Sequence, residues 1–427
     1  MRKTIFVFIS FFSLFSCTTE NELVYQKHST TVPVVNKRSL AEALEIAQEA
    51  ISLLGTQQSR SGDIRTVDMK NVQYLSSNKN SRSQNDDTLL YVINYVDNKG
   101  FAVVSANPNT EGLIAVTEKG TYSSTSEDIS NNDGMKMFMD MAKLYVSDPN
   151  NELQRSGPVT MLEIFEKQDT TETYILPKLT TKWGQTYYEG AYCPNGYSGC
   201  GNTALAQIMA YFEYPTQMDI TYENAPTNRI NLNWTEIKKY EGHFYNDMAN
   251  EAACRNIGYL CRQLGELTHS EYRTLPNATA TFTEDALDAM SSLGYIVSSE
   301  VNDYNKNNFL PALSNNKLIY MRGEQVSGNN TYAHAWVIDG HYERKLHYMR
   351  YVREPNSELW TLDTEQYIYF NYNHINWGLD GSCNGYFINN VFNMANGYEY
   401  DNTDNVHDNL FSLNLQYFLI TRLWIYE

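Results

Sequence analysis

One cysteine of the chain stands in a sequence context suited to nucleophilic chemistry. Cys200 lies between two glycines, and apolar residues then recur at helical spacing until Pro215. This pattern places Cys200 at or just before a helix N-terminus, where the helix dipole and free N–H groups favour a thiolate. The alternative is a buried structural cysteine, since free cysteine is among the most buried residue types. Cys200 is therefore a candidate nucleophile that needs a base elsewhere in the chain.

His334 is the candidate for that base, because a thiolate is stabilised as an ion pair with an imidazolium. It lies in an apolar strand, and strand alternation puts His334, Trp336 and Ile338 on one face. A histidine in such a strand can equally be a satisfied core residue. The other candidate bases are His341, His347 and His374.

Three further residues have side chains that would complete such a site. Asn376 can accept the far ring N–H of the imidazole, and the indole of Trp377 can shield the pair from water. Gln185 lies shortly before Cys200 and can donate a side-chain N–H to an oxyanion. The alternatives are a turn beside a buried tryptophan for residues 376–378 and a solvated loop amide for Gln185.

The elements that must position these residues follow from hydrophobic periodicity. Helices are predicted over residues 40–54, 135–146, 247–264 and 282–293, and from about Cys200 until Pro215. Capping boxes are expected at Ser39 with Glu42 and at Thr281 with Glu284. Strands are predicted over residues 72–75, 89–96, 101–105, 113–116, 332–340, 359–362, 367–372 and 385–388. Because helices precede strands in the second half, the chain is expected to be an α+β protein.

The sequence divides into five segments. Residues 1–17 have a basic start and an apolar run too short to span a membrane, which indicates an export signal. The signal ends in Leu-Phe-Ser-Cys, which resembles a bacterial lipobox and implies a lipid on Cys17; an ordinary signal peptide is the alternative. A polar tether (18–37), a small α+β domain (38–150), a polar linker (151–174) and a second domain (175–427) follow.

Composition narrows the possible partners. The net charge of −18 argues against nucleic acid and anionic membrane surfaces, whose phosphates would be repelled. The chain has neither a CxxC nor an HExxH motif, so no metal or other cofactor is expected. Cys254 and Cys261 lie too far apart along one helix to form a disulfide, and the pairing of the other cysteines stays open.

Four separated motifs carry a family resemblance. They are residues 182–185, residues 193–215 around Cys200, residues 334–340, and residues 374–378 with 385–387. In wording and order they resemble the streptopain family of secreted bacterial cysteine peptidases over about residues 175–390. Residues 100–106 also resemble that family's inhibitory propeptide. The separation between Cys200 and His334 fits papain-like enzymes.

The resemblance implies a papain-like fold, which has a helical and an antiparallel β subdomain. It also implies an endopeptidase made as a zymogen, with 38–150 as the inhibitory propeptide. The implied substrates are proteins or peptides with a hydrophobic residue two positions before the scissile bond. Cys200 would be the nucleophile and His334 the general base and acid. Gln185 and the Cys200 N–H would bind the oxyanion, and Asn376 and Trp377 would support His334.

The sequence departs from the family pattern at several points, which leaves alternatives open. Gly201-Asn202-Thr203 follows the cysteine, Leu379 replaces a tryptophan, residues 187–189 differ, and a long insert separates Asp339 from His374. A transglutaminase-like acyltransferase and a non-catalytic binding lipoprotein are the competing interpretations. We expect the mature protein at the outer membrane or cell surface, held by lipid alone, with release after propeptide cleavage as an alternative.

Overall fold

The computed structural model describes most of the chain. The described residues are 37–55, 65–76, 87–123, 129, 131–148, 163–240, 251–274, 277–327, 330–354, 357–392 and 411–422. They divide into two compact units. One unit contains residues 163–169 and 347–367, and the other contains the remaining described residues. The predicted signal, Cys17 and the tether lie outside the described residues.

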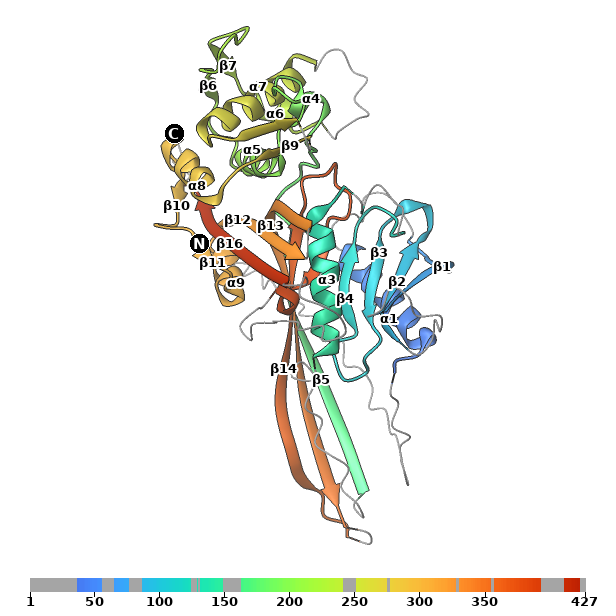
Figure 1. Ribbon diagram of the computed structural model, residues 1–427. Helices are drawn as coiled ribbons and strands as arrows, with labels where there is room; N and C mark the ends of the chain where they lie inside the picture. Colours follow the sequence, from blue (N-terminus) through green and yellow to red (C-terminus); the bar gives the residue numbers. More distant parts are fainter. Residues whose placement is uncertain are drawn as a thin grey trace, which may run out of the picture. The chain divides into compact units, whose positions relative to one another are not determined.

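The N-terminal part of the larger unit is a small α+β fold, as predicted. Its elements are α1 (Leu40–Gly55), β1 (Val67–Ser76), β2 (Thr88–Tyr95), β3 (Phe101–Ser105), β4 (Leu113–Thr117) and α3 (Asp133–Ser147). The strands pair in the order β1-β2-β3-β4, and the pairs are antiparallel (Figure 1). The predicted capping box opens α1, since the Ser39 N–H donates to Glu42 at 2.7 Å and the Glu42 N–H to Ser39 Oγ at 3.2 Å.

A helical part follows. Its elements are α4 (Tyr187–Gly190), α5 (Cys200–Phe212), α6 (Trp234–Ile237), α7 (Glu251–Leu267), α8 (Thr283–Ser292) and α9 (Phe309–Ser314), with the short hairpins β6 (Gln217–Asp219)–β7 (Arg229–Asn231) and β8 (Glu271–Thr274)–β9 (Asn277–Ala280). The capping box predicted for α8 is wrong. The N-cap is Phe282, whose side chain makes no capping bond. The Thr281 hydroxyl forms a hydrogen bond with Ser270 Oγ at 2.8 Å.

The β part is one antiparallel sheet that also takes in the N-terminal strands. Its elements are β10 (Ile296–Val297), β11 (Asn302–Asp303), β12 (Leu318–Ser327), β13 (Asn330–Arg353), β14 (Thr361–Asn376), β15 (Gly385–Ile388) and β16 (Phe411–Thr421). The order continues from β4 as β15-β14-β13-β12-β16-β10. The mixed helix and antiparallel-sheet architecture predicted from the sequence is confirmed.

This sheet separates two hydrophobic cores, as the alternation along β13 predicts. Trp336 and Ile338 pack into the core that contains the N-terminal part. Ala335 and Val337 pack into the core built by α5 and α7. His334 therefore lies on the face of the sheet that the N-terminal part covers.

Two sequence predictions on the insert and the linker are wrong. Residues 163–174 of the predicted linker lie in strand β5 (Glu163–Ile175), which pairs with β13. Its Thr, Tyr and Ile residues favour extended backbone, and the long β13 supplies an edge for it. The two strands predicted over 359–362 and 367–372 belong to one strand, β14, which begins at Thr361. The insert is thus a long β13–β14 ribbon.

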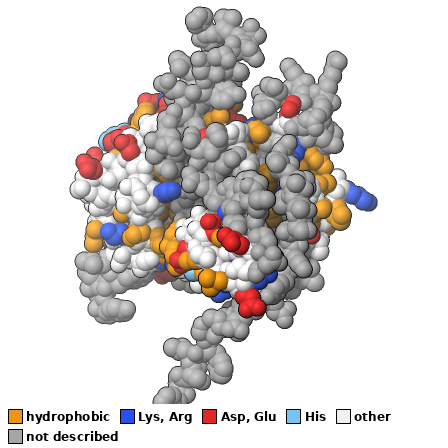
Figure 2. All heavy atoms as spheres, turned by 90° about the horizontal axis from the view of Figure 1, so that it is seen from below, with side chains coloured by type: hydrophobic (Ala, Val, Ile, Leu, Met, Phe, Trp, Pro, Cys, Tyr) orange, Lys and Arg blue, Asp and Glu red, His pale blue; other side chains and the backbone are white. Residues whose placement is uncertain are grey.

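Charge and apolar surface are mixed on the face drawn in Figure 2. Acidic and basic side chains of the described residues are interspersed there with hydrophobic ones. Within the described ranges, no helix combines the length and the apolar character needed to cross a membrane.

Candidate active site

Cys200 begins helix α5, as the sequence predicts. The N-cap is Gly199 at φ 85°, a backbone conformation that strongly favours glycine. A Cβ at Gly199 would lie 2.8 Å from the Thr279 carbonyl oxygen, and one at Gly201 would lie 2.6 Å from Thr281 Cβ. The two glycines therefore let the segment at β9 pack directly against the turn that carries the thiol.

The structure brings His334 to Cys200. The sulfur accepts a hydrogen bond from the backbone N–H of Ala335 at 3.3 Å, so it lies against the strand residue next to His334. Burial disfavours the Cys200 thiolate, but the charge of His334 and hydrogen bonds from His334 and Ala335 outweigh it and lower the thiol pKa. Burial likewise opposes protonation of His334, but Cys200 and the Trp377 carbonyl raise its pKa. Each group therefore favours the charged form of the other, as a thiolate–imidazolium pair requires.

The partner that orients the imidazole differs from the one expected. His334 Nε2 lies 2.8 Å from the backbone carbonyl oxygen of Trp377, and the direct bond expected from Asn376 is not made. The Asn376 amide is used elsewhere: Nδ2 donates to the Thr181 carbonyl at 3.0 Å and to Gln207 at 3.2 Å. Because a buried amide must satisfy its own donors and acceptor, it is not available to the ring.

Trp377 lies beside His334, as the sequence predicts. It is fully buried, and its ring centroid is 6.0 Å from that of His334. Its indole N–H donates to the Cys383 carbonyl at 3.1 Å. Trp377 therefore provides both the apolar cover and, through its backbone, the acceptor for the imidazole.

Gln185 is half-buried on the segment that precedes the Cys200 turn, and its backbone is tied to that turn. Its carbonyl accepts from the Ser198 N–H at 2.9 Å and from the Ser198 hydroxyl at 3.2 Å. The N–H of Gly184, one residue earlier, donates to Glu189 Oε1 at 3.0 Å. The segment with the predicted oxyanion donor is thus held next to the nucleophile.

Glu189 and Gln207 are further parts of this site that the sequence alone does not identify. Glu189 is 1 % exposed, and burial raises its pKa to about 7. The sequence marks this stretch only as a departure from the family pattern. Gln207 lies in an apolar helical stretch, where a lone glutamine gives no signal of its contacts.

The other three candidate histidines have partners elsewhere. His374 Nδ1 lies 2.6 Å from Asp339, His341 bonds to Asn373 at 3.0 Å, and His347 bonds to Glu365 at 2.9 Å. His334 is therefore the histidine of this set that the fold pairs with Cys200. No disulfide joins the described cysteines, and four of them are buried, namely Cys193, Cys254, Cys261 and Cys383.

Helix α3 of the N-terminal part packs directly on the catalytic candidates. A Cβ at Gly134 would lie 2.4 Å from the Trp377 ring and 2.8 Å from His334 Cδ2. The Asp133 carboxylate contributes to the raised pKa of His334. Farther along α3, Phe138 packs edge-on against Phe387 with centroids 4.8 Å apart. The N-terminal part thus covers the imidazole face of the site.

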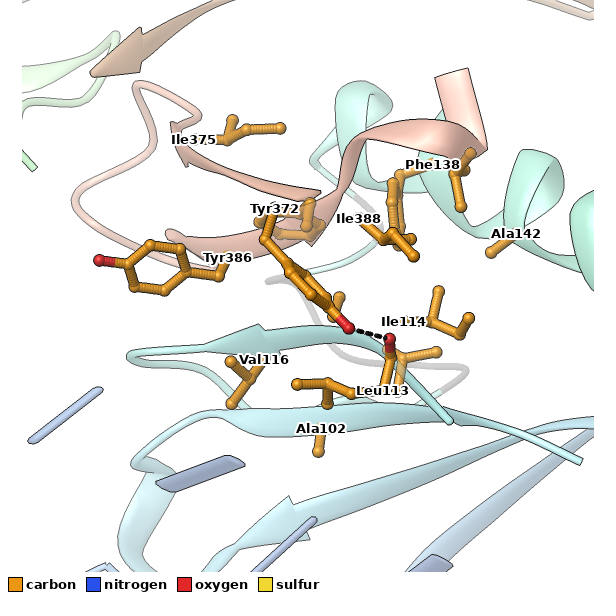
Figure 3. Close-up of a cluster of buried hydrophobic side chains, with 14 of the residues drawn as sticks. Ala102, Leu113, Ile114, Val116, Phe138, Ala142, Tyr372, Ile375, Tyr386 and Ile388 are labelled. Atoms are coloured by element: carbon orange, nitrogen blue, oxygen red, sulfur yellow. Dashed lines mark hydrogen bonds between the residues drawn. The ribbon is translucent and has the colours of Figure 1, made fainter. Parts of the chain in front are cut away.

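Strand β4 extends this contact by pairing with the edge of β15. Ala115, Val116 and Thr117 pair with Phe387, Tyr386 and Gly385, respectively. Figure 3 shows apolar side chains packed around these strands. It also shows the hydrogen bond from the Tyr372 hydroxyl to the Leu113 carbonyl, which is 2.9 Å long. The two parts therefore share one sheet and one core.

Two charge pairs border the same contact. Glu111 accepts from Arg344 at 2.9 Å, and Glu118 lies 3.4 Å from His374 Nε2. Burial opposes protonation of His374, but Asp339 and Glu118 raise its pKa to about 10. His374 is thus a cation held between one carboxylate of each part.

A thiolate–imidazolium pair at a helix N-terminus defines the class of the cysteine peptidases, and comparison with known proteins specifies the family. Residues 183–387 match the model described as the Peptidase C10 family, and residues 33–146 match the Spi protease inhibitor. The chain thus contains a cysteine peptidase domain of the peptidase C10, or streptopain, family, preceded by an inhibitory propeptide domain.

Two solved structures are similar to this chain. A cysteine-to-alanine mutant fragment of prointerpain A from Prevotella intermedia is 18% identical with a TM-score of 0.49, and covers 83% of this chain and 98% of that chain. Active wild-type interpain A cysteine protease from the same organism is 19% identical with a TM-score of 0.36. The match covers 58% of this chain and 94% of the interpain A chain. The search of curated proteins gave no match.

Proposed function

We propose that the chain is the precursor of an exported, lipid-anchored endopeptidase in which Cys200 is the nucleophile and His334 the general acid and base. The observation that carries this proposal is the position of Cys200 at the start of α5, where its sulfur accepts the N–H of Ala335, the residue next to His334, at 3.3 Å. A cysteine–histidine pair of this kind supplies a nucleophile and a proton donor in the same geometry.

The proposed reaction has two steps. The Cys200 thiolate attacks the peptide carbonyl carbon, and the oxyanion is bound by the Cys200 N–H and the Gln185 side chain. The C–N bond then breaks as His334 gives its proton to the leaving amine, which leaves a thioester. Water, deprotonated by His334, attacks the thioester and releases the acid and the thiolate. Trp377 keeps the ring in place through its carbonyl.

Regulation and location complete the proposal. The N-terminal domain blocks the site until the chain is cut in the predicted linker. Since β5 begins at Glu163, we place this cut within residues 151–162. The lipobox-like end of the signal supports lipidation of Cys17 and a place at the outer membrane or cell surface.

One experiment tests the catalytic proposal. The chain without residues 1–17 is incubated under reducing conditions beside Cys200→Ala, while its mass and casein cleavage are followed. Wild type should shorten by the propeptide and then cut casein, and the variant should do neither. Casein cleavage by Cys200→Ala would overturn the proposal, as would labelled amine joined to glutamine side chains without chain cleavage. Mass spectrometry of full-length Cys17→Ala tests the lipid separately.

A further inference from the structure

A buried glutamine on the nucleophile helix links three segments of the site. Gln207 lies on α5, about two turns after Cys200, and is fully buried. Its Oε1 accepts from the Thr181 hydroxyl at 3.0 Å and from the Trp183 N–H at 3.3 Å. The helix that carries the nucleophile is therefore bonded to the segment that leads to Gln185.

The same side chain forms a reciprocal amide pair with Asn376. Asn376 Nδ2 donates to Gln207 Oε1 at 3.2 Å, and Gln207 Nε2 donates to Asn376 Oδ1 at 3.2 Å. Each amide is donor and acceptor to the other, so the pair fixes the orientation of both. Buried away from water, such a pair is costly to break, because each lost partner leaves an unsatisfied polar atom.

The pair in turn fixes the peptide that holds the imidazole. Asn376 Oδ1 also accepts the Gly378 N–H at 3.0 Å, which closes a turn around Trp377. The carbonyl of Trp377, inside that turn, lies 2.8 Å from His334 Nε2. The chain of contacts thus runs from α5 through Gln207, Asn376 and Trp377 to the ring of His334.

We propose that Gln207 is a positioning residue that sets the orientation of the His334 imidazole relative to Cys200, through Asn376 and the Trp377 carbonyl. The proposal rests on the peptidase activity proposed above. It assigns the Gln207–Asn376 pair the orienting function that Asn376 alone was expected to have. An apolar residue of similar size would fill the space at 207 but would not hold the turn.

The test is Gln207→Glu, which is nearly isosteric. Its Oε1 still accepts from Thr181, Trp183 and Asn376, but the second oxygen now faces Asn376 Oδ1. Ionised, the two oxygens repel; protonated, the O–H donates to Asn376 and restores the pair. With processed enzyme we expect kcat to fall by about 10- to 100-fold at neutral pH, with KM nearly unchanged. The ratio of variant to wild-type kcat should recover as pH falls.

Gln263→Glu is the matched control. Gln263 is 2 % exposed on α7, and its amide also has two partners, the N–H of Thr221 at 2.7 Å and the Thr221 hydroxyl at 2.8 Å. Its partner Thr221 is not among the residues that connect Gln207 to His334, so the pH profile of Gln263→Glu should match wild type. A Gln207→Glu profile equal to that of Gln263→Glu, or a change in KM alone, would overturn the proposal.

A second variant keeps the test decisive if Gln207→Glu does not fold. Asn376→Asp places the carboxylate on the other side of the pair and should show the same recovery at low pH. If Cys200→Ala retains wild-type activity, the proposed reaction fails. If Cys200→Ala is inactive but both pair variants keep the wild-type profile, only the function assigned to Gln207 fails.

Discussion

The ionisation of Cys200 depends on two opposing effects, burial and the charge of His334. The charge of His334 and the hydrogen bonds from His334 and the Ala335 N–H outweigh burial, so the thiol pKa lies below its usual value. The thiolate therefore persists as pH falls toward that lowered pKa. In processed enzyme, the rate of alkylation by iodoacetamide should therefore stay high at neutral pH. In His334→Ala, the same rate should fall at neutral pH and rise only at alkaline pH.

The other thiols provide the control for this measurement. Cys193, Cys254 and Cys261 are buried, and burial raises the pKa of each. Cys200→Ala should thus be labelled slowly under native conditions. Equal alkylation profiles of wild type and His334→Ala would show that the ion pair does not exist.

Glu189 has the opposite electrostatic balance from Cys200, since burial raises its pKa to about 7. A carboxyl whose folded pKa is raised favours folding at low pH, and this contribution is lost as pH rises from the unfolded value toward 7. Glu189→Gln keeps an acceptor for Gly184 and removes the charge. At about pH 8 we expect the variant to unfold at a higher temperature than wild type. Its free energy of unfolding should be larger by about 1–3 kcal/mol.

The comparison should be made by thermal unfolding of full-length Cys200→Ala with and without Glu189→Gln. The difference should shrink toward zero near the ordinary glutamate pKa of about 4.5. A difference that is independent of pH would mean that the pKa of Glu189 is the same in the folded and the unfolded protein.

At the residue scale, the sequence predicted the pair but not its surroundings. Cys200 and His334 could be found because flanking glycines and strand alternation are local signals. The acceptor for the imidazole is the backbone carbonyl of Trp377, and no side-chain pattern reveals which peptide oxygen faces a ring. The contacts of Gln207 join segments far apart in sequence, so they depend on tertiary packing alone.

At the scale of elements, helix α3 is the part of the propeptide that meets His334. Gly134 lies inside this helix, where alanine would normally stabilise by about 0.5–1 kcal/mol. Here a Cβ would come within 2.4 Å of the Trp377 ring. We therefore expect Gly134→Ala to destabilise the full chain by about 1–3 kcal/mol and to speed its activation.

Denaturant unfolding in the Cys200→Ala background measures the stability, and the rate of casein cleavage by the otherwise wild-type chain measures activation. Ser147→Ala, at the exposed far end of α3, is the control and should be near neutral. A stabilising Gly134→Ala would indicate that α3 does not press on the site in solution.

Element prediction succeeded where local signals and burial agreed, as in α1 with its capping box and in the hairpin of β2 and β3. It failed for β5, where polar residues suggested a linker. The partner that makes β5 a strand is β13, whose length follows from an insert that no local pattern explains. It also failed at α8, where Thr281 turns to Ser270 in preference to the helix end.

At the scale of the whole molecule, the charge pair of Glu118 and His374 holds the propeptide to the peptidase domain. The pKa of His374 is raised to about 10, because Asp339 and Glu118 outweigh its burial. Its contribution to stability is therefore complete below the unfolded value of about 6.5 and is lost as pH rises toward 10. Burial opposes ionisation of Glu118, but the hydrogen bond and charge of His374 outweigh it and lower the pKa of Glu118. The contribution of Glu118 to stability is therefore lost only as pH falls below about 4.5.

Glu118→Gln removes one of the two carboxylates around His374 without changing the size of the side chain. In full-length Cys200→Ala we expect it to lower the free energy of unfolding by about 2 kcal/mol between about pH 4.5 and 6.5. The difference should diminish above neutrality and vanish above about pH 10. Glu45→Gln, on the exposed face of α1, is the control and should change little at any pH. An effect of Glu118→Gln that is constant across this range would mean that the propeptide is held by the shared sheet and core alone, and that His374 is not charged in the zymogen.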